Sequence, residues 1–364
     1  MVLKKVCYIQ PIVANYSVPL FLELGRHWQL TVLYSPAKMT HGYDSDTTAH
    51  IHGVNSRKIS MIKPLGNKIG MYQIGIIRQL KNLRPDAVII FANMRYLSFW
   101  TTMIWCKINS IPVYPRGHGV YRKESPGLFW KIIYQVLLSA CTAYICYTPS
   151  VAASLRCLGL PTRKITIAEN SLDNPHSVEP NEKTDVEHGI LYIGRLRPGC
   201  RLELLINTVK CIRDMGHPEV TVHIIGDGPE AKRIRQLASD IPWIQFNGAV
   251  YDSEQINRIS RSCMVGCYPG NAGLSIVHLM SLSLPPITHD NLTTHEGPEP
   301  SYIKSGENGL LFDHRNPEAG LLSALIYVLE KPNELKRMQA NAYATYEQIA
   351  KPSLAMRIIN IVGE

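Results

Sequence analysis

The stretch CYPGNAGLSIVHLMSLSLPPITHD, residues 267–290, says more about the fold than any other part of the chain. It reads as a strand end, a turn with two glycines, a short helix and a second buried strand. Gly270 and Gly273 allow the backbone to approach a ligand closely, and a helix that opens at 274–276 directs N–H groups and a positive dipole end toward an anion. Such a turn at the carboxyl end of a strand is typical of a nucleotide site in a parallel α/β sheet.

Apolar, strand-like runs alternate with helical segments along the whole chain, and this alternation predicts parallel sheets. A polar, proline-bearing segment, 174–187, separates two such series and is predicted to be a linker. We expect two doubly wound, Rossmann-like domains, 1–173 and 188–340, which face a central cleft, and a C-terminal helical segment, 341–364, which returns to the first domain. The predicted strands are 6–9, 30–34, 87–91, 111–114, 143–146, 165–168, 190–193, 220–225, 264–267 and 286–288.

The net charge of +9 is unevenly distributed. Residues 1–180 contain 20 Lys and Arg against 8 Asp and Glu, whereas 181–364 contain 18 against 21. The basic half predicts an anionic partner, and a negatively charged membrane leaflet fits it better than nucleic acid, for which no binding signature is present. Four cations, Arg57, Lys58, Lys63 and Lys68, precede a helix-like stretch, 71–83, that adds Arg78 and Lys81. A generic solvated basic face is the alternative.

The chain has no stretch that reads as a signal peptide or a membrane span. The most hydrophobic window, 128–147, contains Lys131 and divides into a helix-like and a strand-like part. Its nine cysteines form no Cys-x-x-Cys pair, so the sequence predicts neither a zinc site nor a disulfide framework. We therefore expect a cytoplasmic protein, peripheral on the cytoplasmic face of the inner membrane.

Five short motifs follow one another in the second half of the chain. They are IGRLRPGCR (193–201), IIGDGP (224–229), FNGAV (246–250), the glycine turn quoted above, and GENGLLF (306–312). In this order they closely resemble the family-4 retaining glycosyltransferases of the GT-B fold. In the first half, YIQPIVANYSVPLF (8–21), RGHG (116–119) and ENSLD (169–173) resemble the same family, in its bacterial surface-polysaccharide branch.

The resemblance implies a nucleotide-diphosphate sugar as the donor and no cofactor. A diphosphate leaving group gains charge as the glycosidic bond breaks, so it needs cations or oriented N–H donors. Arg195 and Arg201 are the candidates, because a guanidinium can bind two phosphate oxygens, and Gly194 lies beside them. A surface or interdomain salt bridge is the alternative for Arg195. The family's usual lysine position holds Cys200, so Arg201 has to act from the next position.

The chain departs from the family in its most quoted signature, two glutamates eight residues apart. Gly270 occupies the first position and His278 the second. A neutral histidine can still hydrogen-bond a nucleotide ribose, although a structural histidine is the alternative. We expect Asn271, or the backbone at Ala272 and Gly273, to contact the sugar. Leu274 and Ser275 belong to the same donor-binding turn, and Glu299 or Glu296 is a possible substitute for a lost glutamate.

The remaining site residues follow from the resemblance. His118 occupies the place of a histidine near the donor sugar, and Arg116 beside it adds positive potential toward an anionic acceptor. Asn15 and Tyr16 lie in the acceptor-side loop, and Val250 lies where backbone groups line the base pocket.

We predict a metal-independent, retaining hexosyltransferase, because the sequence has no Asp-x-Asp pair poised directly after a strand. The resemblance implies the same, since GT-B enzymes generally use dipoles and basic side chains instead of a metal. The expected acceptor is a lipid-linked or other glycan in lipopolysaccharide, O-antigen or capsule assembly. Two alternatives remain open: a non-catalytic partner subunit that kept the fold, and a different GT-B class such as an inverting transferase or an epimerase.

Overall fold

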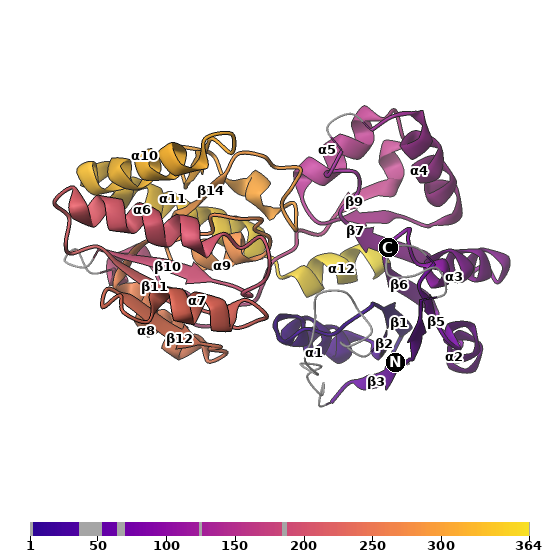
Figure 1. Ribbon diagram of the computed structural model, residues 1–364. Coiled ribbons are helices and arrows are strands. Elements are labelled where there is room, and N and C mark those ends of the chain that lie inside the picture. The colour runs from indigo at the N-terminus through magenta and orange to yellow at the C-terminus, as the bar shows by residue number, and fades with distance from the viewer. Residues whose placement is uncertain (1–2, 36–52, 64–69, 124–125, 184–187, 364) are drawn as a thin grey trace. The chain divides into compact units, whose positions relative to one another are not determined.

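A computed structural model describes residues 3–35, 53–63, 70–123, 126–183 and 188–363. It divides into two compact units (Figure 1). Unit 1 comprises Met1–Asp173 together with Pro352–Glu364, and unit 2 comprises Asn174–Lys351. Each unit contains a parallel sheet with helices on both faces, the doubly wound architecture that the alternating sequence pattern predicts.

The sheet of unit 1 is parallel throughout, with the order β3-β2-β1-β6-β7-β8-β9. Its strands are β1 (Lys5–Ile9), β2 (Gln29–Tyr34), β3 (Asn55–Lys58), β6 (Ala87–Phe91), β7 (Val113–Gly117), β8 (Tyr144–Cys146) and β9 (Ile165–Ile167), and a separate antiparallel pair comprises β4 (Met61–Ile62) and β5 (Tyr72–Gln73).

Alternate side chains of these strands build two cores. Cys7 and Ile9 of β1 pack with α2 (Ile76–Leu83), α3 (Leu97–Ile108), α4 (Leu128–Ala140) and α5 (Pro149–Cys157). Val6 and Tyr8 point to the other face, where they pack with α1 (Val18–His27) and α12 (Leu354–Gly363). The period of two along a strand therefore assigns each helix to its face of the sheet.

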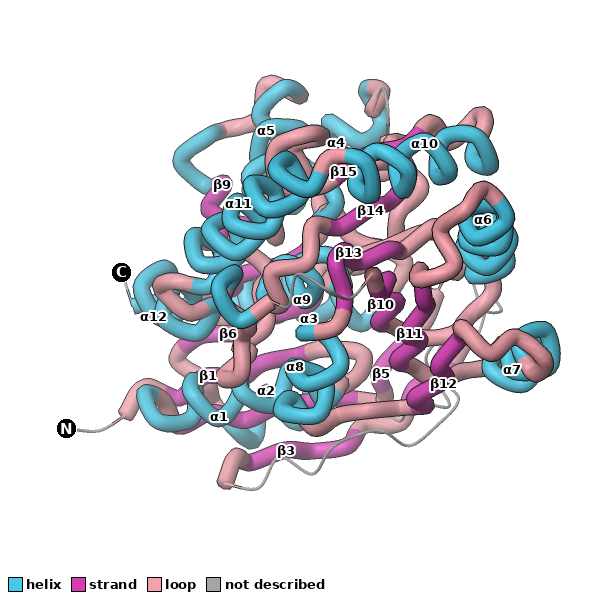
Figure 2. The backbone as a smooth tube through the Cα atoms, turned by 90° about the vertical axis from the view of Figure 1, so that its left-hand side faces the viewer, coloured by secondary structure: helices cyan, strands magenta, loops and turns pink. Residues whose placement is uncertain are grey.

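Unit 2 has a second parallel sheet, with the order β12-β11-β10-β13-β14-β15, which Figure 2 shows side by side. Its strands are β10 (Gly189–Ile193), β11 (Thr221–Ile225), β12 (Ile244–Gly248), β13 (Cys263–Cys267), β14 (Pro286–His289) and β15 (Leu310–Phe312). Its helices are α6 (Leu202–Asp214), α7 (Ala231–Ala238), α8 (Ser253–Arg261), α9 (Ser275–Ser281), α10 (Pro317–Glu330) and α11 (Pro332–Ala350). The central strands β10 and β13 are buried throughout, as expected of strands covered on both faces.

All ten predicted strands are present, but the helix predicted over 71–83 is wrong in its first part. There Tyr72 and Gln73 pair with β4, and Gly75 in the left-handed region (φ 79°) separates them from α2, which begins at Ile76. Arg57 and Lys58 lie on β3, whereas Lys68 falls outside the described residues.

The C-terminal segment also differs from the expectation of one returning helix over 341–364. The chain stays in unit 2 through α11 and passes to unit 1 between Lys351 and Pro352. Proline cannot continue a helix, so the break falls there. Segment 174–183 packs with unit 2 rather than standing apart as a linker: Asn174 is buried, and its amide donates to Ser281 Oγ at 2.8 Å.

Candidate functional site

The carboxyl edge of the unit 2 sheet brings together most of the predicted donor-binding residues. From β10 the chain runs outward to β11 and β12, and then returns to β13 on the other side of β10. Such a switch point leaves a crevice at the strand ends, because the following connections depart in opposite directions. The loop 194–201 follows β10, and the turn 268–274 follows β13.

The two loops pack backbone against backbone, and glycines make this possible. A Cβ at Gly270 would lie 1.9 Å from the Gly199 carbonyl oxygen. The loop that follows β11 approaches the β10 loop equally closely, because a Cβ at Gly226 would lie 1.9 Å from the Gly194 carbonyl oxygen. Gly270 is therefore required by the neighbouring loop, whereas the sequence analysis attributed it to a ligand. A Cβ at Gly273 would meet nothing closer than 3.5 Å, so packing does not require that glycine.

Gly194 of the β10 loop lies close to Ser275 at the start of α9, so two separately predicted donor-binding segments are neighbours. A Cβ at Gly194 would lie 3.1 Å from Ser275 Oγ and 2.8 Å from the Tyr268 ring. Leu274 is the N-cap of α9, and its carbonyl accepts from the His278 N–H at 3.1 Å. The N–H of Ile276, predicted to be exposed, instead donates to the Gly273 carbonyl at 3.0 Å.

Arg195 and Arg201 differ in their surroundings. Arg195 is half-buried, and its carbonyl accepts a hydrogen bond from the Tyr192 hydroxyl at 3.1 Å. Arg201 is the exposed N-cap of α6 and has left-handed backbone (φ 54°), which is uncommon for a residue with a Cβ. Within the described part of the chain, the Arg201 guanidinium makes no ion pair. It is therefore available to an anion.

A third arginine of the same loop, Arg197, has a structural role that the sequence analysis missed. Its guanidinium donates to the Asn271 carbonyl at 2.9 Å and pairs with the Glu296 carboxylate at 2.8 Å. Arg197 thus joins the β10 loop to the β13 turn. Its ion pair also engages the Glu296 carboxylate, which was considered as a substitute for a lost family glutamate.

Two buried histidines, His289 and His295, contact the glycine turn through hydrogen bonds. The rings of His289 and His295 stack at 4.0 Å between centroids with an angle of 6°. His295 Nδ1 accepts from the Ala272 N–H at 3.0 Å, so its Nε2 carries the proton and donates to the His289 carbonyl at 3.0 Å. His289 Nε2 lies 3.2 Å from Asn271 Oδ1. Neither histidine was predicted to belong to the site, although His289 directly follows the strand predicted over 286–288 and ends the observed β14.

These contacts bear on the expectation that Asn271 or the backbone at Ala272 binds the donor sugar. The Ala272 N–H is bound to His295 and is not available to a sugar. Asn271 remains available, because its Oδ1 is engaged by His289 while its amide Nδ2 has no hydrogen-bond partner among the described residues. We infer that the stacked pair orients the Asn271 amide group as a donor.

Burial keeps both histidines neutral. Desolvation lowers the pKa of His289 to about 4, and the charge of Arg201 adds to this effect. Desolvation and the neighbouring His289 lower the pKa of His295 to about 3. The tautomers described above therefore persist throughout the physiological pH range.

His278 and Glu299 lie on either side of the turn. His278 lies one turn into α9, and its ring has no hydrogen-bond partner within the described residues. Burial lowers the pKa of His278 to about 4, so the ring is neutral. Glu299 is 2% exposed, and a Cβ at Gly273 would lie 3.8 Å from its Oε2. Glu299 is therefore close enough to the turn to remain a candidate for a lost glutamate's role.

The end of β12, the outermost strand on the β11 side of the unit 2 sheet, lies at the same carboxyl edge. The Gly248 carbonyl accepts from the Gly226 N–H at 2.7 Å, which brings the second and third motifs together. Val250 packs against the core beneath, and the Tyr251 side chain is 69% exposed. The base-binding role of this segment stays a prediction.

One group among the described residues has the spacing of metal ligands: Asp290, Asp313 and His314, all exposed. His314 Nδ1 bonds Asp290 Oδ1 directly at 2.7 Å. This contact holds the group together without a cation, and surface carboxylates of this kind are common.

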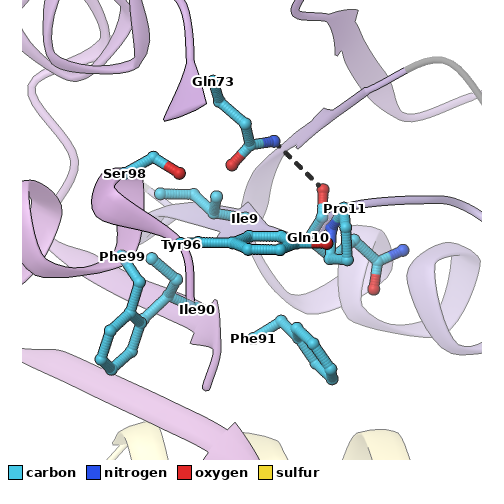
Figure 3. A pocket seen from close by; sticks show the side chains of 9 residues that line it. All are labelled: Ile9, Gln10, Pro11, Gln73, Ile90, Phe91, Tyr96, Ser98 and Phe99. Carbon is cyan, nitrogen blue, oxygen red and sulfur yellow. Dashed lines mark hydrogen bonds between the residues drawn. The ribbon is translucent and has the colours of Figure 1, made fainter. Parts of the chain in front are cut away.

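In unit 1, the carboxyl edge of the sheet contains a small pocket at the switch point between β1 and β6 (Figure 3). Gln73 spans it, because its Nε2 lies 3.4 Å from the Gln10 carbonyl and 3.1 Å from Ser35 Oγ. The predicted acceptor-side residues Asn15 and Tyr16 follow in the same β1 to α1 connection, where Tyr16 is 57% exposed. The lining residues are Ile9, Gln10, Pro11, Gln73, Ile90, Phe91, Tyr96, Ser98 and Phe99.

His118 follows β7 at the same edge and lies among aromatic rings. Its ring centroid lies 4.6 Å from that of Tyr147, 5.6 Å from Tyr121 and 6.2 Å from Phe91. Burial, aided by the charges of Arg122 and Arg116, lowers the pKa of His118 to about 3. The neutral ring can form hydrogen bonds but cannot supply positive charge at neutral pH.

Arg116 is more deeply placed than the predicted acceptor role requires. It is 5% exposed, its guanidinium donates to Asn170 Oδ1 at 3.0 Å, and it stacks 4.1 Å from the Tyr147 centroid. These contacts hold β7 against the segment that follows β9, and the acceptor role of Arg116 stays a prediction.

Two family descriptions match the sequence in succession. "Glycosyltransferase Family 4" matches residues 15–174, and "Glycosyl transferases group 1" matches residues 187–331. Together they cover both units. The chain belongs to glycosyltransferase family 4.

Solved glycosyltransferases share the fold of this one. HepE of Anabaena, in complex with UDP and glucose, has a TM-score of 0.69 at 13% identity and covers 99% of this chain and 100% of its own. Sucrose-phosphate synthase of Thermosynechococcus elongatus has a TM-score of 0.71 at 15% identity, with 99% and 98% covered. The lipopolysaccharide outer core galactosyltransferase WaaB, in its apo form, has a TM-score of 0.68 at 14% identity, with 99% of both chains covered. No curated protein matches the sequence of this glycosyltransferase significantly.

Proposed function

We propose that this glycosyltransferase is a metal-independent, retaining enzyme that moves a hexose from a nucleotide-diphosphate sugar to a lipid-linked glycan in bacterial surface-polysaccharide assembly. The observation that carries the proposal is the β10/β13 switch point, where the close-packed glycine loops lie beside an exposed Arg201 that makes no ion pair with any described residue. An anionic diphosphate fits such a crevice, because backbone and guanidinium groups can both approach its oxygens.

The donor base is proposed to be uridine. HepE, of the same fold, is described in complexes with UDP and with UDP-glucose. In this chain, His278 would hydrogen-bond the ribose and Asn271 would donate to a sugar hydroxyl. The neutral His278 ring, which has no hydrogen-bond partner among the residues that the structure describes, supports the first assignment, and the orientation of the Asn271 amide by His289 supports the second.

Retention would proceed on one face of the sugar. The bond between the anomeric carbon and the diphosphate oxygen breaks, the acceptor oxygen attacks the same face, and the acceptor proton passes to the departing phosphate. Arg195 and Arg201 would stabilise the growing phosphate charge. His118 would contribute hydrogen bonding only, since its pKa of about 3 keeps it neutral. This chemistry requires no protein nucleophile, so the absence of the family's two glutamates does not argue against it.

The acceptor assignment is supported by the kind of protein that shares the fold, including WaaB of the lipopolysaccharide outer core. The basic excess of residues 1–180 supports binding to the anionic cytoplasmic face of the inner membrane, where lipid-linked glycans are elongated. Among the described helices, none is long and apolar enough to cross a bilayer.

The test is donor turnover by the purified protein across a panel of UDP-, GDP- and dTDP-sugars, with nucleotide release and the anomeric configuration of the product as readouts. We expect hydrolysis of one UDP-hexose, with retention, and its loss in the Arg201→Ala variant. Arg258→Ala is the matched control, because Arg258 is an exposed arginine on α8 of the same unit. Tight nucleotide binding without turnover on any donor would instead favour a non-catalytic partner subunit, and an inverted product would favour another GT-B class.

A further inference from the structure

Helix α4 of unit 1 exposes an apolar stripe to solvent. Leu128 is 72% exposed, Phe129 68%, Ile132 51% and Val136 53%. At about 100° per residue these four side chains project within roughly 100° of one another, so they form one continuous face. The opposite side of the helix packs into the core through Tyr134, Leu137 and Leu138. We call the four exposed residues the α4 face.

The neighbouring helix α3 extends this apolar character. Ile104 is 57% exposed and Ile108 is 76% exposed, one turn apart on the same side of α3. The C-terminal ends of the two helices meet, because Lys107 Nζ lies 3.5 Å from the Ser139 carbonyl. Figure 1 shows α4 next to α5 on the outside of unit 1. Contiguous exposed apolar patches bordered by polar residues often mark a binding surface.

The charges around the α4 face identify the kind of partner. Residues 87–168, which contain α3, α4 and α5, have nine Lys and Arg and a single acidic residue, Glu124. Two aromatic and cationic pairs precede or open α4: Lys123 lies 5.4 Å from the Trp130 ring, and Arg122 Nε donates to the Tyr121 hydroxyl at 2.8 Å. Apolar side chains bordered by cations and a tryptophan are typical of a helix lying in the headgroup region of an anionic bilayer.

In the surface predicted from sequence, the described residues 57–63 and 70–81 do not show this combination. Arg57 donates to Gln79 Oε1 at 2.8 Å, and the exposed large apolar residues nearby, Ile62 and Ile74, lie on no common helix face. Charge alone gives weak, salt-sensitive attraction to lipid, whereas an inserted apolar face gives the larger share of binding.

We propose that the α4 face inserts into the headgroup region of an anionic membrane and that Lys123, Lys131 and Arg122 bind its lipid phosphates. This deepens the proposed function by naming the surface that docks to the membrane carrying the acceptor. Vesicle binding is measured without donor or acceptor, so a failure here and a failure of sugar transfer can be told apart.

The experiment is flotation of the full-length protein with phosphatidylethanolamine vesicles, with or without phosphatidylglycerol. We expect binding only to the anionic vesicles, and a decrease of roughly tenfold or more in the partition coefficient for Phe129→Ser combined with Ile132→Ser. Met215→Ser, an equally exposed apolar residue of unit 2 (61%), is the control and should bind as the parent does. The Lys123→Glu, Lys131→Glu variant should lose the preference for anionic lipid.

Three outcomes would overturn the proposal. In the first, the Phe129→Ser, Ile132→Ser variant floats like the parent. In the second, binding is lost only on charge reversal at Arg78 and Lys81, which would return the docking surface to α2. In the third, sedimentation shows a dimer that the serine variant dissociates while vesicle binding is unchanged, which would make the α4 face an interface between copies.

Discussion

Arg201 and Arg195 are the residues on which the proposed chemistry depends most. Replacing either by alanine removes a charge directed at the leaving diphosphate. We expect each variant to lose about 2–4 kcal/mol of transition-state stabilisation, with the fold intact. The rates of donor hydrolysis by these variants, compared with the rate of the Arg258→Ala control, measure this loss of transition-state stabilisation. A rate within about threefold of the parent for Arg201→Ala would end its phosphate assignment.

By resemblance, His278 stands where the family has a glutamate, and the role proposed for it can be tested by nucleotide affinity. If the neutral ring bonds the ribose, His278→Ala should weaken UDP binding by about 1–2 kcal/mol, and His278→Gln should recover part of the loss. Because burial lowers the pKa of His278 to about 4, affinity should be flat between about pH 5.5 and 7.5. An unperturbed histidine would titrate in that interval. Isothermal titration of UDP gives both results, and unchanged affinity in the alanine variant would assign His278 to structure alone.

The buried His295 links protonation to stability. Its folded pKa, about 3, lies below the value of about 6.5 for an unfolded histidine, so the unfolded chain binds the extra proton. Stability is therefore full above about pH 6.5 and decreases as the pH falls through the interval down to 3, by at most about 1.4 kcal/mol per pH unit for this group.

The His295→Gln variant tests this linkage, because glutamine can still accept from the Ala272 N–H but does not titrate. We expect the variant to be less stable than the parent at pH 7 and to lose less stability between pH 7 and 5. Urea unfolding at both pH values is the measurement. His176→Gln, at an exposed position, is the control, and an unchanged pH slope in His295→Gln would contradict the linkage.

At the scale of elements, the turn between β13 and α9 depends on contact between backbones. Gly270→Ala would place a Cβ 1.9 Å from the Gly199 carbonyl oxygen, and its nearest neighbours are all backbone atoms of Gly199 and Cys200, which cannot move aside as a side chain can. We expect loss of nucleotide binding and a clear decrease in thermal stability. Gly127→Ala, with nothing within 4 Å of the added Cβ, is the control. Normal nucleotide binding by Gly270→Ala would show that the two loops can separate without consequence.

Helix α12 is distant in sequence from the rest of unit 1 but contributes side chains to the core of that unit. Ile358 and Val362 are fully buried in the core that contains Phe21 and Leu24 of α1, and Ser353 Oγ donates to the Glu23 carboxylate at 2.9 Å. Arg357 also pairs with Glu169.

We expect Ile358→Ala to destabilise unit 1 by about 2–5 kcal/mol, because it leaves a cavity in a closely packed core. The exposed Asn360→Ala on the same helix should cost little. Chemical denaturation, monitored through hydrogen exchange of the α1 amides, would measure the change in the free energy of unfolding of unit 1. Equal stability of the two variants would mean that α12 contributes little to the unit.

The sequence was most informative where elements are regular and apolar. Fully buried strands such as β10 and β13 were predicted correctly, because a continuous apolar run bounded by glycine has few other interpretations. The polar edge strand β3, of sequence NSRK, has no such pattern and was missed.

The candidate site shows the same division. Leu274 and Ser275 could be placed in one turn from the sequence because they are adjacent, and their role in donor binding stays a prediction. The contacts of Arg197, His289 and His295 join separate loops, and a single sequence does not record which side chains meet across them. They explain why the Ala272 N–H is unavailable, which the turn alone did not predict.

For the whole molecule, the proposed catalysis involves no cation. We expect EDTA to leave donor hydrolysis unchanged, because the proposed phosphate ligands are Arg195 and Arg201. Loss of turnover on chelation, restored by magnesium or manganese, would refute the metal-free proposal. The Asp290→Asn, Asp313→Asn variant would then show whether the exposed group with His314 is the site concerned.

The return of the chain at Pro352 also has a consequence for synthesis on the ribosome. Residues 3–173 emerge before unit 2, but the face of their sheet that α1 covers stays only partly covered until α12 emerges, after every residue of unit 2. The unit that is translated first is therefore completed last, and its nascent form exposes Phe21, Leu24 and Trp28 while the second unit can already close around its own core. A nascent chain stalled before Pro352 would present that apolar surface to chaperones.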